Sequence, residues 1–376
     1  MDDFDLAEYL STGVENLVKS ILRTTFKDPK ESAFMVSYSR SAKEATKRRA
    51  ELNKEGVHIP PFLIASITSS CNLHCAGCYA RHNQACCDSA PVEQLSDAEW
   101  LKIFHEARDL GISFILLAGG EPMLRRDVIR AAGGVPEILF PIFTNGTMID
   151  ESYLELLEKH RNLVPVFSIE GHKEKTDTRR GQGVYERLTR SMMKMQNTHL
   201  IFGASVTVTR ENLGEVFSRD FVEDLHRRGC KVVFYVEYVP VSAATGSLAP
   251  TDEDRVSMEL NMSELRSSYP DMIFIAFPGD EKSTGGCLAA GRGFFHINSH
   301  GGAEPCPFSP YSDSNVRETS LRESLKSDLF RALQSESILT GEHIGGCVLF
   351  EQKDKVEAIM ERNKRECLAS GECQSL

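Results

Sequence analysis

Three closely spaced cysteines carry the strongest chemical signal in this sequence. Cys71, Cys75 and Cys78 occur in the segment C-N-L-H-C-A-G-C, directly after an apolar run at residues 62–68. Thiolates are the usual protein ligands of iron–sulfur clusters. Spacings of four and three residues let one short loop present three sulfurs to a 4Fe–4S cube and leave the fourth iron open. An open iron is what a cluster needs in order to bind and reduce a cofactor directly.

A zinc site is the alternative for the same loop. Structural zinc takes four Cys or His ligands, so His74 or His82 would have to supply the fourth. The loop follows the first predicted strand, and α/β folds bind their ligands at the carboxyl ends of strands. This position favours the cluster.

The pattern C-x-x-x-C-x-x-C after a first strand resembles the radical S-adenosylmethionine (radical SAM) superfamily. The resemblance implies that the open iron chelates the amino and carboxylate groups of SAM. It also implies that an electron, from a donor such as flavodoxin or ferredoxin, cleaves SAM to a 5′-deoxyadenosyl radical that abstracts hydrogen from a substrate. The residue before the last cysteine is commonly aromatic in this family, but here it is Gly77.

A second motif follows the second apolar run, at Gly119, Gly120, Glu121 and Pro122. Paired glycines let the backbone approach a ligand, and a carboxylate can accept a hydrogen bond from an ammonium group. In this position the segment resembles the GGEP motif of the same family. The resemblance implies that it receives the SAM amino group.

Further polar residues follow the third and fourth predicted strands. Asn145 places hydrogen-bonding groups at the same edge of the sheet and is a candidate SAM contact. By resemblance, Ser168 and Glu170 contact the SAM ribose, and Arg180, which precedes Gly181, binds the SAM carboxylate. The alternative for each residue is ordinary turn chemistry or surface charge.

A second group of cysteines occurs near the C-terminus, at Cys287, Cys306 and Cys347. The segment from Cys287 to Cys306 resembles the opening of the SPASM/Twitch extension of radical SAM enzymes, although the dense cysteine run of a full extension is missing. The resemblance implies an auxiliary 4Fe–4S cluster held by these three residues. A fourth ligand is Cys230, Cys367, Cys373 or none, and structural thiols or a zinc site are the alternatives. We predict no role for Cys86 and Cys87.

The sixth predicted strand offers candidate substrate contacts. Alternation places Tyr235 and Glu237 on one face and Tyr238 on the other. A glutamate in an apolar strand is costly unless it is partnered. Either the first two side chains point into the barrel and touch substrate, or they face a helix or a sheet edge.

Short apolar runs alternate with amphipathic stretches through the middle of the chain, which predicts βα units and a parallel sheet. The predicted strands are 62–68, 112–118, 138–144, 164–170, 202–209, 232–239 and 294–298. The predicted helices are 96–110, 125–132, 150–160, 184–196, 213–228, 252–268, 318–334 and 351–367.

Periodicity alone allows an incomplete barrel or an open doubly wound sheet. The family resemblance implies a partial (β/α)6 TIM-like barrel with a small cysteine-rich C-terminal module. We predict an N-terminal helical segment over residues 1–58, a radical SAM core over 59–250 and the auxiliary-cluster domain over 251–376.

Composition limits the partners of the protein. The net charge of −11 argues against general nucleic-acid binding. An acidic N-terminus and the lack of any long apolar run argue against secretion and membrane insertion, so we expect a cytoplasmic protein. Eleven cysteines, an odd number, fit metal ligation better than a disulfide framework.

The first functional hypothesis is a radical SAM enzyme that modifies a peptide or protein. An anaerobic tetrapyrrole enzyme, or another enzyme acting on a small molecule, is the alternative. A non-catalytic iron–sulfur redox sensor is the alternative from a different functional class.

Overall fold

The computed structural model describes residues 29–87, 93–240, 243–278, 285–336, 338–340 and 347–370. Its strands are β1 (Phe62–Thr68), β2 (Phe114–Gly119), β3 (Phe140–Thr144), β4 (Leu163–Ser168), β5 (Gly203–Val208), β6 (Val232–Glu237), β7 (Ile273–Phe277), β8 (Phe294–Ile297) and β9 (Ala303–Glu304). The helices up to β6 are α2 (Pro29–Lys54), α3 (Tyr79–His82), α4 (Asp97–Leu110), η1 (Pro122–Leu124), α5 (Arg126–Gly133), α6 (Glu151–Lys159), α7 (Lys173–Arg180), α8 (Val184–Asn197), α9 (Leu213–Val216) and α10 (Arg219–Arg227). Those that follow are η2 (Ala243–Leu248), α11 (Asp252–Ser268), α12 (Leu321–Ser324), α13 (Asp328–Ser335), α14 (Val348–Glu351) and α15 (Lys353–Ser370).

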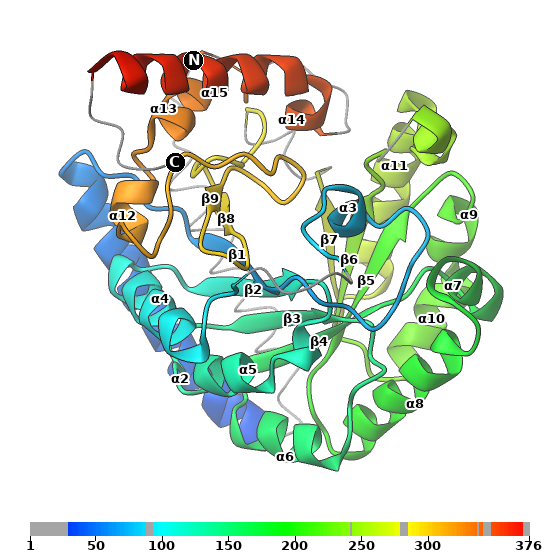
Figure 1. The fold of residues 1–376 in the computed structure, drawn as a ribbon. Coiled ribbons are helices and arrows are strands. Elements are labelled where there is room, and N and C mark those ends of the chain that lie inside the picture. The colour runs from blue at the N-terminus through cyan, green and yellow to red at the C-terminus, as the bar shows by residue number, and fades with distance from the viewer. Residues whose placement is uncertain are drawn as a thin grey trace.

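The strands form one sheet in the order β7-β6-β5-β4-β3-β2-β1-β8-β9. Every neighbouring pair is parallel except β8 with β9. In Figure 1 the sheet curves, and α4, α5, α6, α8 and α10 lie around its outside. The predicted partial α/β barrel is confirmed. No helix among the described residues combines the length and the hydropathy that a membrane span requires.

The six predicted strands of the barrel are all present, but two predicted helices are each divided. The predicted helix 213–228 is interrupted because the Ser218 side chain accepts a hydrogen bond from Phe221 N and starts α10 anew. Ser327 does the same at the start of α13. At the start of α11, which matches the predicted helix 252–268, Thr251 and Asp254 form a reciprocal capping box.

The C-terminal strands join the barrel sheet. β7, which the alternation analysis does not predict, extends the sheet beyond β6. β8 pairs in parallel with β1, and His296 on β8 lies 2.7 Å from Ser66 of β1 and 2.7 Å from Glu304 of β9. All three side chains are buried. The domain boundary near residue 250 stays a prediction, and strands from beyond it complete both edges of the sheet.

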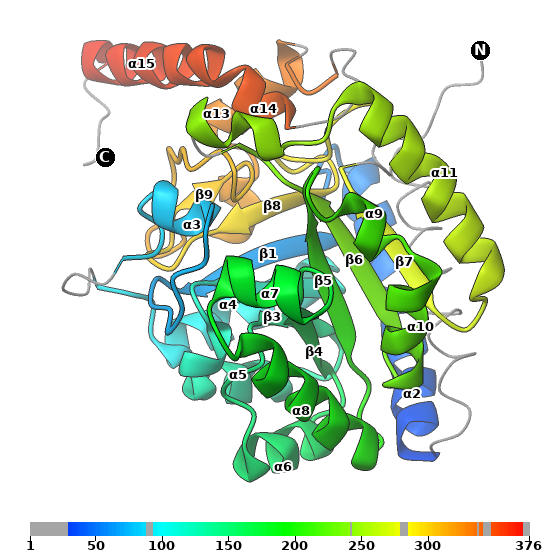
Figure 2. The same ribbon diagram turned by 90° about the vertical axis from the view of Figure 1, so that its right-hand side faces the viewer.

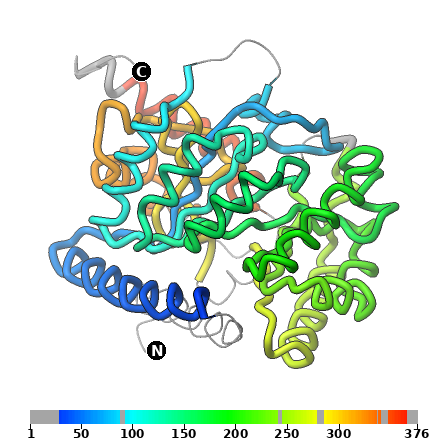
Figure 3. The backbone as a smooth tube through the Cα atoms, turned by 90° about the horizontal axis from the view of Figure 1, so that it is seen from below, coloured from blue at the N-terminus to red at the C-terminus, as the bar shows by residue number. Residues whose placement is uncertain are grey.

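Helix α2 covers the amino ends of the first strands (Figure 3). Met35 and Tyr38 pack in a cluster with Phe114, Leu139 and Val164, which lie at or just before the starts of β2, β3 and β4. The predicted N-terminal helix is confirmed from Pro29 onward, and residues 1–28 lie outside the described residues. The barrel is therefore closed at the end opposite the cysteine loop.

Candidate functional site

Cys71, Cys75 and Cys78 all lie on the loop that joins β1 to α3, which we call the cysteine loop (residues 69–78). The loop leaves β1 at its carboxyl end, and Cys78 is the residue before the first turn of α3. The three side chains are half-buried, and none of them is in a disulfide. The position predicted for them at this edge of the sheet is confirmed.

The Gly119–Gly120 pair packs against the start of the cysteine loop. A Cβ atom at Gly119 would lie 2.3 Å from the carbonyl oxygen of Thr68, and one at Gly120 would lie 2.0 Å from that of Ser70. Gly120 N donates to the Thr68 carbonyl at 2.8 Å. Only glycine fits at both positions, so the pair fixes how closely the end of β2 approaches the loop.

Glu121 is bonded to the framework of the site. Its carboxylate is only 1% exposed and accepts hydrogen bonds from Thr144 Oγ1 at 2.7 Å, Asn145 N at 2.8 Å and Met123 N at 2.9 Å. Burial raises the pKa of Glu121 in spite of these bonds. The carboxylate therefore joins the ends of β2 and β3, and Pro122, also buried, begins η1 behind it. The contact predicted between this motif and the SAM amino group stays a prediction.

Asn145 holds the cysteine loop to the end of β3. Its Nδ2 donates to Asn72 Oδ1 at 2.8 Å, and Asn72 Nδ2 donates to Thr147 Oγ1 at 2.9 Å. Thr147 in turn donates its hydroxyl to Asn145 Oδ1 at 2.7 Å. The amide groups predicted to contact SAM are thus engaged in a closed network with the loop.

Glu170 and Arg180 form a buried ion pair beside the loop. Arg180 Nε donates to Glu170 Oε1 at 2.8 Å, whereas the buried Oε2 has no partner among the described residues. Burial lowers the pKa of Arg180, but the Glu170 carboxylate and the nearby cysteines together outweigh burial, so the pKa is raised. The charges of Cys75 and Cys78 act in the same direction. Both predicted residues therefore lie at the loop, with a charged guanidinium and one unused acceptor.

Arg179 is a functional position that sequence reasoning missed. Its carbonyl accepts from Ala76 N at 2.8 Å, and its Nε donates to the Ala76 carbonyl at 3.2 Å. Its Nη1 donates to Glu170 Oε1 at 2.6 Å. The end of α7 is therefore hydrogen-bonded to the cysteine loop between Cys75 and Cys78. Ser168, the remaining predicted contact on this side, is half-buried at the end of β4.

The thiols of the loop influence one another. Burial raises the pKa of Cys75; Arg180 and Arg179 oppose this effect, and Cys78 and Cys71 add to it. A hydrogen bond with Cys86, followed by burial, raises the pKa of Cys71. Within the described part of the chain, no three His, Cys, Asp or Glu side chains are gathered closely enough to hold a metal ion. The thiols are neighbours on one loop, but their side chains do not converge.

The second cysteine group also comes together in space. Cys287, Cys306 and Cys347 line one narrow pocket, with Glu237 and Phe308 beside them. Cys287 and Cys306 are buried and Cys347 is half-buried. Residues that are 60 positions apart in the chain thus face a common cavity at the carboxyl end of β6.

The candidates for a fourth ligand lie elsewhere or are not described. Cys230 is buried before the amino end of β6, and its thiol donates to the Val232 carbonyl at 3.3 Å. At about 3.3 Å per strand residue it is roughly 20 Å from Glu237, so its position does not suit a ligand of this pocket. The backbone of Cys367 belongs to α15, and Cys373 lies outside the described residues.

Of the two positions left open for Tyr235, the structure shows the one that faces a helix. Its ring is buried and stacks on Phe217 with centroids 4.3 Å apart, and its hydroxyl donates to the Val216 carbonyl at 2.8 Å. Glu237, on the same face, binds Arg255 of α11 at 2.9 Å and borders the cysteine pocket. The partner that a buried glutamate requires is therefore Arg255. It is Tyr238, on the other face, that reaches the cysteine loop.

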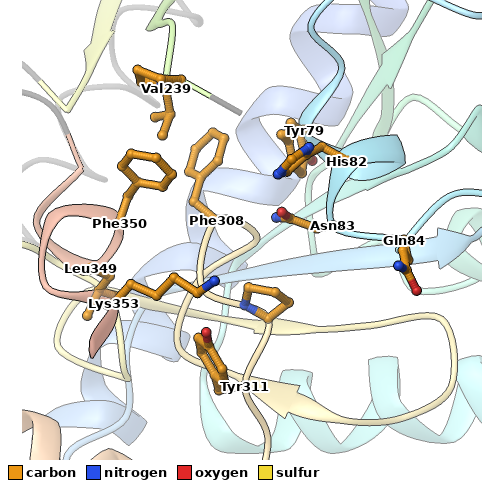
Figure 4. Close-up of a pocket in the computed structure, with 12 residues that line it drawn as sticks. Tyr79, His82, Asn83, Gln84, Val239, Phe308, Tyr311, Leu349, Phe350 and Lys353 are labelled. Atoms are coloured by element: carbon orange, nitrogen blue, oxygen red, sulfur yellow. The ribbon is translucent and has the colours of Figure 1, made fainter. Parts of the chain in front are cut away.

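A larger pocket of about 260 Å³ adjoins the cysteine pocket (Figure 4). The two pockets share Val239 and Phe308. The Phe308 ring contacts Tyr79, the residue after Cys78, with centroids 4.8 Å apart. The lining combines aromatic rings with a few polar groups: Tyr79, His82, Asn83, Gln84, Val239, Pro240, Phe308, Pro310, Tyr311, Leu349, Phe350 and Lys353.

Comparisons with known proteins agree with this arrangement. Residues 65–217 match the Radical SAM superfamily. The chain is 27% identical over 311 residues to the AdoMet-dependent heme synthase of Methanosarcina barkeri, a match that covers 75% of this chain and 87% of that one. It is also 27% identical over 299 residues to the PqqA peptide cyclase of Rhizobium meliloti, covering 74% of this chain and 77% of that one.

A solved structure shares the fold. The crystal structure of Streptococcus suis SuiB bound to precursor peptide SuiA superposes with a TM-score of 0.61 at 18% identity. The superposition covers 80% of this chain and 71% of that one. At this identity the likeness supports the fold alone.

Proposed function

Because the chain belongs to the radical SAM superfamily, and is an enzyme with a 4Fe–4S cluster and SAM as cofactors, we propose that Cys71, Cys75 and Cys78 are the ligands of that cluster. The observation that carries this proposal is the location of three thiols on one loop, held between the Gly119–Gly120 pair and the Glu170–Arg180 pair.

The surrounding residues suit SAM. When bound, the cluster and SAM together supply one-electron chemistry that abstracts a hydrogen atom from a substrate. The unused Oε2 of Glu170 is a buried acceptor and suits a ribose hydroxyl, with Ser168 beside it. The guanidinium of Arg180 suits the SAM carboxylate. The segment Gly119–Pro122, with its close backbone and the Glu121 carboxylate, is the proposed contact of the SAM amino group.

We assign the second cysteine group to an auxiliary 4Fe–4S cluster. Cys287, Cys306 and Cys347 supply three soft ligands around one pocket. Glu237 at the rim is held by Arg255, so it suits either a contact to substrate or an outer hydrogen bond to the cluster. The fourth ligand of this cluster would be Cys367, Cys373 or an exogenous group.

The proposed substrate is a peptide or protein. The PqqA peptide cyclase and SuiB bound to a precursor peptide are relatives or structural neighbours whose names include a peptide. The 260 Å³ pocket supports this choice, because its aromatic rings and amides suit an amino-acid side chain and its backbone (Figure 4). It lies between the two cysteine groups, where a substrate would be near both.

A tetrapyrrole is the second candidate substrate. The matching heme synthase is covered over 87% of its length, more than the peptide cyclase at 77%.

We further propose a cytoplasmic enzyme that receives electrons from flavodoxin or ferredoxin and does not bind nucleic acid generally, in keeping with its net charge of −11.

Mass spectrometry distinguishes the two substrates. The anaerobically reconstituted enzyme, with SAM and dithionite, is incubated in parallel with a library of short peptides and with Fe-coproporphyrin III. We expect 5′-deoxyadenosine in both, and a change in mass only in members of the peptide library. A mass change in the porphyrin alone would favour the second candidate, and no 5′-deoxyadenosine at all would favour a redox sensor.

A further inference from the structure

Tyr238 is a buried side chain whose polar group has no partner. It follows β6, and its backbone N donates to the Val208 carbonyl at 2.9 Å, continuing the pairing with β5. The side chain is 4% exposed, and its hydroxyl makes no hydrogen bond among the described residues. A buried hydroxyl without a partner is unfavourable, so it is uncommon in a folded protein. By contrast, the hydroxyl of Tyr235 on the same strand is satisfied by the Val216 carbonyl.

The hydroxyl is aimed at the cysteine loop. A Cβ atom at Gly77 would lie 2.7 Å from the phenolic oxygen of Tyr238, and 3.2 and 3.3 Å from two of its ring carbons. Gly77 also has a φ of +66°, a conformation that favours glycine. The ring therefore occupies the space that a side chain at Gly77 would fill, with its hydroxyl against the backbone between Cys75 and Cys78.

Two carbonyls of this segment are already engaged. The Ala76 carbonyl accepts from Arg179 Nε, and the Cys78 carbonyl accepts from His82 N at 3.1 Å. Cys75 and Cys78 flank the segment that the hydroxyl faces, so their sulfurs and the sulfides of a cluster that they bind are further acceptors there, beside the carbonyl of Gly77 itself. Hydrogen bonds to the sulfurs of an iron–sulfur cluster stabilise its more negative, reduced state and raise its potential.

We propose that the Tyr238 hydroxyl donates a hydrogen bond to a sulfur of the cluster held by the cysteine loop, and so sets its reduction potential. Tyr238 is then a positioning and tuning residue rather than a catalytic one. The inference rests on the proposed ligand set, and it assigns this task to a residue of β6 that is remote in sequence from the cysteines. It also explains why a phenol remains unpaired at the loop.

The test is an anaerobic redox titration of the reconstituted enzyme without SAM, followed by electron paramagnetic resonance. The signal of this cluster is identified as the one missing in Cys75→Ala. We expect Tyr238→Phe to keep its iron and to have a lower midpoint potential than the wild type. The expected decrease in the equilibrium constant for reduction is about tenfold, which corresponds to a decrease in midpoint potential of about 59 mV for one electron. Tyr235→Phe is the matched control, because it removes a buried phenol of the same strand that bonds to a carbonyl, and its potential should equal that of the wild type.

Two results would overturn the inference while leaving the ligand set intact. One is an unchanged potential in Tyr238→Phe with full iron content. The other is a shift that occurs only after SAM is added, which would mean that the hydroxyl serves SAM. If the wild type has no reducible cluster that Cys75→Ala lacks, the proposed ligand set fails as well.

Discussion

At the scale of single residues, burial and neighbouring groups determine the pKa values of the thiols in the cysteine loop. Arg180 and Arg179 both favour the thiolate form of Cys75, yet burial outweighs them and its pKa is raised. The pKa of Cys71 is also raised, first by its hydrogen bond with Cys86. Without a metal, both groups are therefore thiols at neutral pH. Iron binds the thiolate, so loading the cluster must release protons.

This proton release predicts a pH dependence of cluster assembly. Because both pKa values lie above that of an ordinary cysteine, a higher pH removes protons that iron would otherwise have to displace. We expect the extent of reconstitution at limiting iron and sulfide to increase from pH 7 to pH 9, as measured by absorbance near 400 nm. Independence of pH over that range would mean that these thiols are already ionised in the metal-free protein.

At the scale of elements, the ends of β2 and β3 are joined by one buried carboxylate. Glu121 accepts from a side chain and a backbone amide at the end of β3 and from Met123 N in η1. The end of β2 in turn supports the cysteine loop through Gly119 and Gly120. Glu121 thus acts on the site by holding its framework.

Glu121→Ala should therefore destabilise the fold. Each buried donor left without an acceptor costs roughly 1–3 kcal/mol, so three such donors predict a loss of at least about 3 kcal/mol. Urea unfolding measures the effect. Glu264→Ala is the control, because that carboxylate is 70% exposed and only 4.0 Å from Arg219, and it should change stability by less than about 0.5 kcal/mol. Equal losses in the two variants would contradict the role given to Glu121.

Hydrophobic periodicity predicted most helices and strands, because the formation of these elements depends mainly on residues that are close together in the chain. The strand at Phe62–Thr68 and the cysteine loop after it were identified from an apolar run and two spacings. Two positions stayed open for Tyr235 because alternation says which residues share a face, but not which face points inward. The role of Arg179 and the contact of Tyr238 with Gly77 depend on distant segments, and sequence periodicity has no access to them.

At the scale of the whole molecule, the C-terminal segment completes the site. β8 docks on β1, which brings Cys306 toward the strand that precedes the cysteine loop. The contact between the rings of Tyr79 and Phe308 then connects the two cysteine groups. In Figures 1 and 2, α14 and α15 lie at one end of the molecule and α6 at the other. The pocket that adjoins both cysteine groups is lined by aromatic rings, and Phe350 at its edge is exposed.

The measurement that tests the central proposal most directly is the yield of 5′-deoxyadenosine from SAM under anaerobic, reducing conditions in three proteins. The wild type should form it, and Cys75→Ala should form none and contain less iron. Cys230→Ala should match the wild type, because that buried thiol lies at the opposite end of β6. Equal yields from wild type and Cys75→Ala, or zinc in place of iron at the cysteine loop, would contradict the assignment of these three thiols to a SAM-binding cluster.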